Sequence, residues 1–160
     1  MPIKHRYWDA ATFLGWLNGE QEKVKVSKGV ISEGESGSLK IVTSAFTIAE
    51  VIYLKGHPKI TVDKKEMVCR FFENDYIVTV AVDRFVAESA RELLWQHKAL
   101  KPKDAIHVAT ALYKNIQIFD TFDEGLIRLN GKIGNPPLQI GKPDLPYQTE
   151  LPFETENTTK

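Results

Sequence analysis

Short apolar segments alternate with longer amphipathic segments along most of this chain, and this alternation limits the folds available to it. Segments 39–43, 76–82 and 116–119 are short and rich in β-branched or aromatic residues, which is typical of strands. Between them, segments such as 84–98 place apolar residues on one helical face. Strands separated by helices predict an α/β sandwich with a mostly parallel central sheet.

The remaining elements follow from the same patterns. We expect a strand at 6–8, helices at 12–17, 45–54, 63–72, 104–113 and 121–129, and an edge strand at 138–140. Capping-box spacing of Asp63 with Glu66, and of Thr121 with Glu124, supports two of the helix starts. Residues 20–38 are rich in Lys, Glu, Gly and Ser, and we expect 32–38 to be a mobile loop.

Length and composition narrow the class of protein. A chain of 160 residues suits one domain, predicted at 1–150, with a disordered tail at 151–160. The formal net charge is zero, so any binding of nucleic acid depends on a local basic patch. The single cysteine, Cys69, excludes an intramolecular disulfide and a cysteine-rich zinc site. Without a signal-peptide core or an apolar run of about 20 residues, we expect a cytoplasmic protein.

Acidic residues occupy the junctions where strands meet helices. Asp9 follows the first strand, while Asp120 and Asp123 follow the last strong one. Glu50 lies in the helix after the second strand, and Asp104 begins the helix before the last. Because ligands bind at the carboxyl ends of the strands in parallel sheets, we expect these acids to converge on one edge.

A cluster of carboxylates predicts a bound cation, because closely packed like charges repel one another. A donor set without a histidine and cysteine cluster suits Mg²⁺ or Mn²⁺. Such ions neutralise phosphate esters and activate water for in-line attack. The acids therefore predict phosphodiester chemistry.

Each acid also has an ordinary structural explanation. Asp9 and Asp123 stand where helix N-caps are common, and Asp104 complements the dipole of its helix. Glu50 on a helix is usually a solvated charge, although its neighbours here are apolar. The functional interpretation depends on all four acids occurring in order at matching junctions.

Four segments carry a family resemblance: 7–14, 42–51, 103–111 and 121–123, the third being the most specific. They resemble the PIN-domain family of nucleases, in particular the VapC-type toxins, from about residue 7 to 129. The resemblance implies a parallel sheet between helices and an endoribonuclease that uses Mg²⁺ or Mn²⁺. By position, Asp9, Asp104 and Asp123 would hold the metal, Glu50 would bind it or orient the attacking water, and Thr12 would support the site.

Several neighbouring residues have open roles. Asp120 stands where the family usually has an apolar residue, so it either helps to bind metal or faces solvent. His107 is interpreted as a packed histidine, with a hydrogen bond near the site as the alternative. Lys98, Lys101 and Lys103 are candidates for contact with the RNA backbone. Lys23, Lys25 and Lys28 form a second strip, interpreted as plain surface, in the segment 19–38, whose loops we expect to set specificity.

The resemblance also implies partners. A toxin of this type would be blocked by a small antitoxin protein and would form a homodimer. The alternative is a non-catalytic PIN-like module that binds RNA or protein, which the retention of all four acids disfavours. A receiver domain would need a second acid near Ala11, and a dinucleotide-binding fold would need a glycine pattern that is absent.

Overall fold

The computed structural model describes residues 2–144, so the tail predicted at 151–160 lies outside the described residues. Its centre is a five-stranded sheet with the order β3-β2-β1-β4-β5. Every strand pairing is parallel. The strands are β1 (Lys4–Trp8), β2 (Leu39–Ser44), β3 (Ile77–Val80), β4 (Ile118–Asp120) and β5 (Gln139–Gly141). The predicted fold class and the edge strand near 138–140 are therefore confirmed.

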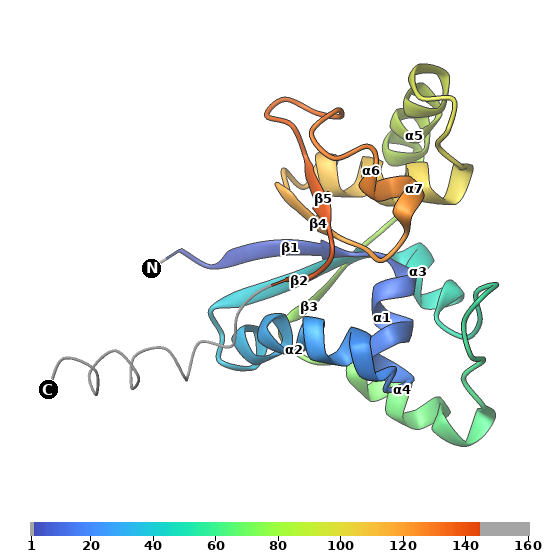
Figure 1. The fold of residues 1–160 in the computed structure, drawn as a ribbon. Coiled ribbons are helices and arrows are strands. Elements are labelled where there is room, and N and C mark those ends of the chain that lie inside the picture. The colour runs from blue at the N-terminus through green and yellow to red at the C-terminus, as the bar shows by residue number, and fades with distance from the viewer. Residues whose placement is uncertain (1, 145–160) are drawn as a thin grey trace, which may run out of the picture.

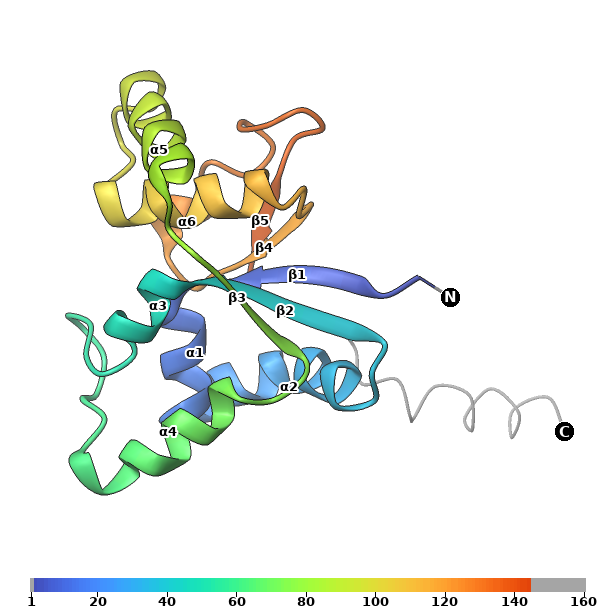
Figure 2. The same ribbon diagram turned by 180° about the vertical axis from the view of Figure 1, so that it is seen from behind.

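Helices cover both faces of the sheet (Figures 1 and 2). One face carries α1 (Ala10–Leu17), α2 (Gln21–Glu35) and α4 (Lys65–Phe72), with the short 3₁₀ helix η1 (Val62–Lys64) leading into α4. The other face carries α5 (Arg84–Gln96) and α6 (Pro102–Tyr113). Two short helices come after the strands β2 and β4: α3 (Ala45–Glu50) follows β2 directly, and α7 (Glu124–Ile127) follows β4 after a three-residue connection. None of the helices within residues 2–144 is long and apolar enough to cross a membrane.

Alternating side chains of the central strands supply two separate cores. Tyr7 and Val42 are buried with residues of α5 and α6, while Trp8 and Ile41 are buried with residues of α1 and α2. This is the period-two alternation of a strand covered on both faces. It explains why the buried parts of β1 and β2 carry consecutive apolar residues, Tyr7-Trp8 and Ile41-Val42.

The prediction of a loop at 32–38 is wrong for residues 32–35, because α2 continues to Glu35. Val30, Ile31 and Gly34 are buried residues of this helix. A methyl group added at Gly34 would come within 2.8 Å of the Tyr76 ring, so the helix packs closely there. Tertiary packing outweighs the weak helix propensity of this Gly- and Ser-containing segment. The specificity loop expected at 19–38 is likewise mostly helix.

Neither predicted capping box forms. Asp63 accepts a hydrogen bond from the Thr61 hydroxyl, and α4 begins at Lys65 without a side-chain cap. The N-cap of α7 is Asp123, whose Oδ1 accepts the Gly125 N–H at 2.8 Å. At both helix starts, the hydrogen bonds expected for a capping box are therefore replaced by other local hydrogen bonds. Helix α3 also ends earlier than expected, at Glu50.

The strand order places a topological switch at the middle of the sheet. The chain moves outward from β1 to β2 and β3, then returns to the opposite side of β1 to add β4 and β5. The connections after β1 and β4 therefore separate at their carboxyl ends. Asp9 follows β1 directly and Thr121 follows β4, so both lie at the position where parallel sheets bind ligands.

Candidate active site

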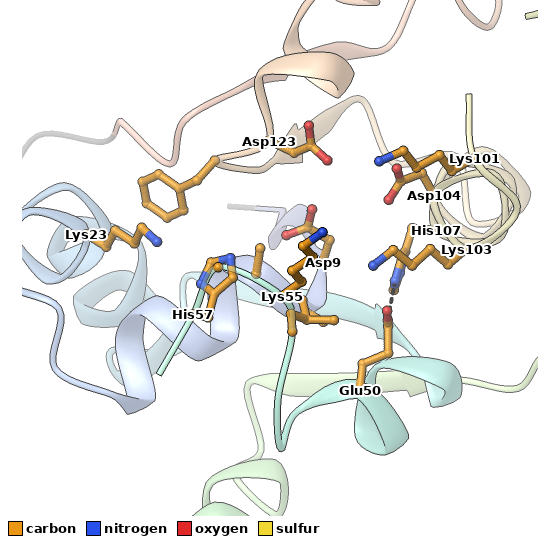
Figure 3. Close-up of a pocket in the computed structure, with 15 residues that line it drawn as sticks. Asp9, Lys23, Glu50, Lys55, His57, Lys101, Lys103, Asp104, His107 and Asp123 are labelled. Atoms are coloured by element: carbon orange, nitrogen blue, oxygen red, sulfur yellow. Dashed lines mark hydrogen bonds and ion pairs between the residues drawn. The ribbon is translucent and has the colours of Figure 1, made fainter. Parts of the chain in front are cut away.

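A cavity of about 480 Å³ opens at this edge of the sheet. All four predicted acids line it, namely Asp9, Glu50, Asp104 and Asp123 (Figure 3). They come from the ends of β1 and β4, from α3 and from the first turn of α6. The fold thus brings together residues separated by more than a hundred positions in the sequence.

Asp9 is both a helix cap and a wall of the cavity. Its Oδ1 accepts hydrogen bonds from the backbone N–H of Thr12 at 3.1 Å and from the Thr12 hydroxyl at 2.8 Å. Its Oδ2 accepts a bond from the Thr121 hydroxyl at 2.6 Å. Burial raises the pKa of Asp9, while His107 and these hydrogen bonds lower it. The carboxylate is therefore fixed in orientation before any ligand arrives.

Asp104 is held close to two other acids. Pro102 opens α6 and places Asp104 in the first turn, facing the cavity. Burial, together with the charges of Asp123 and Asp9, raises the pKa of Asp104 to about 6. Mutual repulsion of this kind marks a position that a cation would stabilise.

Glu50 is held by a buried chain of polar side chains. His107 Nε2 lies 2.7 Å from Glu50 Oε1, and His107 Nδ1 lies 2.6 Å from the Tyr7 hydroxyl. Tyr7 is fully buried and His107 is 2% exposed. The imidazole ring thus joins Tyr7 to Glu50 through its two nitrogens. His107 is thus both a packed histidine and a partner of the site.

Asp120 lies outside the cavity lining. Its carboxylate accepts bonds from Arg6 Nε at 2.8 Å, Arg6 Nη2 at 2.7 Å and Trp8 Nε1 at 2.9 Å. The residue is only 1% exposed, so its carboxylate faces neither solvent nor the cavity. Its backbone oxygen accepts the Thr12 hydroxyl at 3.0 Å, which links it to Asp9 through Thr12.

Basic side chains line the cavity beside the acids. Lys101 and Lys103 line the cavity, whereas Lys98 is not among the residues that line it. The lining also includes Lys23, Lys55 and His57. Lys23 belongs to the second candidate strip, which was interpreted as plain surface, and the other two residues were not predicted. No local pattern marks Lys55 and His57, because only the path of the chain after α3 brings them to the cavity. Thr121 was considered only as a cap, yet it holds Asp9.

The chemistry of the donors fits a hard divalent cation, since the acids facing the cavity offer carboxylate oxygens. As the side chains stand, no three His, Cys, Asp or Glu residues within 2–144 converge closely enough to enclose an ion. Asp9, Asp104 and Asp123 are nevertheless close enough for their charges to affect one another. The acids therefore suit a divalent cation by their charge and by their oxygen ligands.

Comparison with known protein families finds a match over the part of the chain that carries this site. The sequence matches the PIN domain over residues 7–132, a span that includes all four acids and the sheet edge that carries them. This chain belongs to the PIN domain family. No curated protein matches it in sequence.

Solved structures share the fold of this PIN domain. One is a toxin–antitoxin complex from Klebsiella pneumoniae, with a TM-score of 0.58 and 18% identity over 88% of this chain and 99% of that one. Another is VapC20 of Mycobacterium tuberculosis, a sarcin-ricin loop cleaving toxin, with a TM-score of 0.59 and 18% identity over 77% of this chain and 94% of that one. At this identity the likeness concerns the fold.

Proposed function

We propose that this PIN domain is an endoribonuclease that depends on Mg²⁺ or Mn²⁺. The observation that carries the proposal is one cavity lined by four acids and flanked by lysines. Acids alone would repel a polyanion, and lysines alone would only bind it. The combination suits a phosphodiester held over a cation.

In this proposal Asp9, Asp104 and Asp123 hold the cation. A bound Mg²⁺ or Mn²⁺ supplies positive charge that neutralises the scissile phosphate and makes water a better nucleophile. Thr12 and Thr121 fix both oxygens of the Asp9 carboxylate, so that ligand need not reorganise on binding. Lys101 and Lys103 bind the RNA backbone on the α6 side.

Glu50 orients the attacking water in this proposal. Its Oε1 is occupied by His107, which fixes the direction in which the carboxylate faces the cavity. Hydrolysis forms a bond from the water oxygen to phosphorus and breaks the ester bond to one ribose oxygen, which leaves as a hydroxyl with a proton that the water gives up. His107 acts as a positioning residue, because its contact is with Glu50 and not with substrate.

We further propose that the protein is the toxin of a toxin–antitoxin pair and acts in the cytoplasm. Of the two solved structures described above, one is a toxin–antitoxin complex and the other a toxin. An antitoxin protein would then cover the acidic cavity, and a homodimer would be the working unit. Co-expression with the product of a neighbouring gene, followed by size-exclusion chromatography, tests both partners.

The alternative is a non-catalytic module that binds RNA or protein. Isothermal titration calorimetry with Mg²⁺ and Mn²⁺ separates the two. The nuclease proposal expects cation binding by the wild type, retained in Asp75→Asn at an exposed acid outside the cavity lining and lost in Asp104→Asn. Absence of cation binding by the wild type would favour the binding module, and cleavage of RNA tests the activity itself.

A further inference from the structure

The cavity has a second basic side that the proposed mechanism does not use. Lys23 and His57 lie on the opposite side of Asp9 and Asp123 from Lys101 and Lys103 (Figure 3). The acids therefore stand between lysines on two sides of the cavity. This arrangement suits a strand with phosphates on both sides of the cleaved bond.

Neighbouring residues hold the Lys23 side chain in place. Its side chain lies across Gly15 of α1, where a methyl group would come within 2.6 Å of Lys23 Cδ. The ammonium lies 3.0 Å from Glu20 Oε1 and 5.5 Å from the centre of the Phe122 ring. A glycine, an acid and an aromatic ring thus direct this lysine to the cavity.

The neighbouring lysines show the contrast. Lys25, on the same helix, is exposed, and neither it nor Lys28 is among the residues that line the cavity. Of the strip Lys23, Lys25 and Lys28, only Lys23 reaches the site. The sequence spacing could not separate them, because the distinction comes from the packing of α2 against α1.

Phe122 supplies a ring beside this lysine. It is half-buried, lines the cavity and directly precedes Asp123. An aromatic ring next to a cation is the combination that binds a base and its phosphate in single-stranded nucleic acids. His57, whose Nδ1 lies 3.8 Å from Glu20 Oε2, closes the same side of the cavity.

We infer that Lys23 and Phe122 form a nucleotide-binding subsite for single-stranded RNA. It takes the nucleotide on the side of the cleaved bond away from Lys101 and Lys103, with the base against Phe122 and the phosphate against Lys23. The inference rests on the proposed ribonuclease function. Because every base has a π-face, stacking on Phe122 adds affinity at that nucleotide without selecting one base.

The test compares the wild-type chain with Phe122→Leu, Lys23→Gln and the matched control Lys25→Gln. A mixed RNA pool is incubated with Mn²⁺, and the new ends are sequenced to find an RNA that the wild type cuts. KM and kcat are then measured on that RNA. We expect Phe122→Leu to raise KM about tenfold through the loss of one stacked base, while the salt dependence of KM stays that of the wild type. We expect Lys23→Gln to raise KM and to reduce its salt dependence. Lys25→Gln should behave as wild type.

A second variant moves the lysine without removing its charge. Gly15→Ala places a methyl group against the Lys23 side chain, so we expect the KM of Gly15→Ala to rise as it does in Lys23→Gln. Thermal melting of each variant checks folding. If the wild type is active and its KM is unaffected by Phe122→Leu and by Lys23→Gln, the subsite alone is overturned. A wild type that neither binds nor cuts RNA overturns the ribonuclease proposal together with it.

Discussion

At the scale of single residues, Asp104 shows the conflict between stability and function most directly. Its pKa lies near 6 instead of the ordinary 3.8 because of burial and the nearby charges of Asp123 and Asp9. A carboxyl group whose pKa is raised in the folded state destabilises that state once the group ionises. The wild type therefore loses stability as pH rises from about 3.8 to about 6.

Asp104→Asn removes this charge and should raise the melting temperature in EDTA. The gain over the wild type should be absent below the ordinary pKa of 3.8 and reach its full size above about pH 6. Thermal melts at a series of pH values measure it. Added Mn²⁺ should stabilise the wild type and not the variant, because only the wild type keeps its full set of ligands. A gain independent of pH would contradict this electrostatic account.

Tyr7 should act on catalysis through His107. Tyr7→Phe leaves the buried Nδ1 of His107 without its bond to the hydroxyl, which should cost about 1–3 kcal/mol of unfolding free energy. Because Glu50 then loses its fixed orientation, kcat should fall while KM for RNA changes little. Urea unfolding and steady-state kinetics measure both. Tyr113→Phe, at a half-exposed tyrosine outside the cavity lining, is the control, and an unchanged kcat in Tyr7→Phe would refute the positioning role.

At the scale of elements, a buried ion pair ties the two strands that carry the site. Arg6 in β1 and Asp120 in β4 are joined by two hydrogen bonds, with Trp8 adding a third to the carboxylate. Arg6→Met would leave that carboxylate buried without its cation. We expect a loss of roughly 3–5 kcal/mol in unfolding free energy, measured by urea denaturation. The double variant Arg6→Met/Asp120→Asn should recover part of the loss, and additive losses would show that the pair is not coupled.

The packing of α2 on the sheet gives a second test at this scale. Gly34→Ala places a methyl group 2.8 Å from the Tyr76 ring, so we expect a loss of roughly 1–3 kcal/mol despite the better helix propensity of alanine. Glu35→Ala, at the exposed neighbour, should be nearly neutral. Equal melting temperatures for Gly34→Ala and the wild type would mean that the Tyr76 ring moves aside freely.

At the scale of the whole molecule, the sequence was most informative where the apolar pattern of a strand and the acids after that strand point to the same edge of the sheet. Strands such as 39–43 and the acids that follow them could be predicted, since a buried parallel sheet requires apolar strands and exposes the next residues at one edge. The end of α2 could not be predicted, because Gly34 is helical through its close packing against Tyr76. Nor could the roles of Asp120 and Lys23, which depend on Arg6 and Gly15 lying beside them in space.

Cleavage of RNA by the purified protein tests the central claim most directly. The wild type, Asp104→Asn and the exposed-acid control Asp75→Asn are incubated with a mixed RNA pool in Mg²⁺, Mn²⁺ or EDTA. We expect the wild type and Asp75→Asn to cut RNA with a cation present and to stop in EDTA, while Asp104→Asn stays inactive throughout. Cutting by Asp104→Asn at the wild-type rate, or cutting that persists in EDTA, would contradict a metal-dependent nuclease at this cavity.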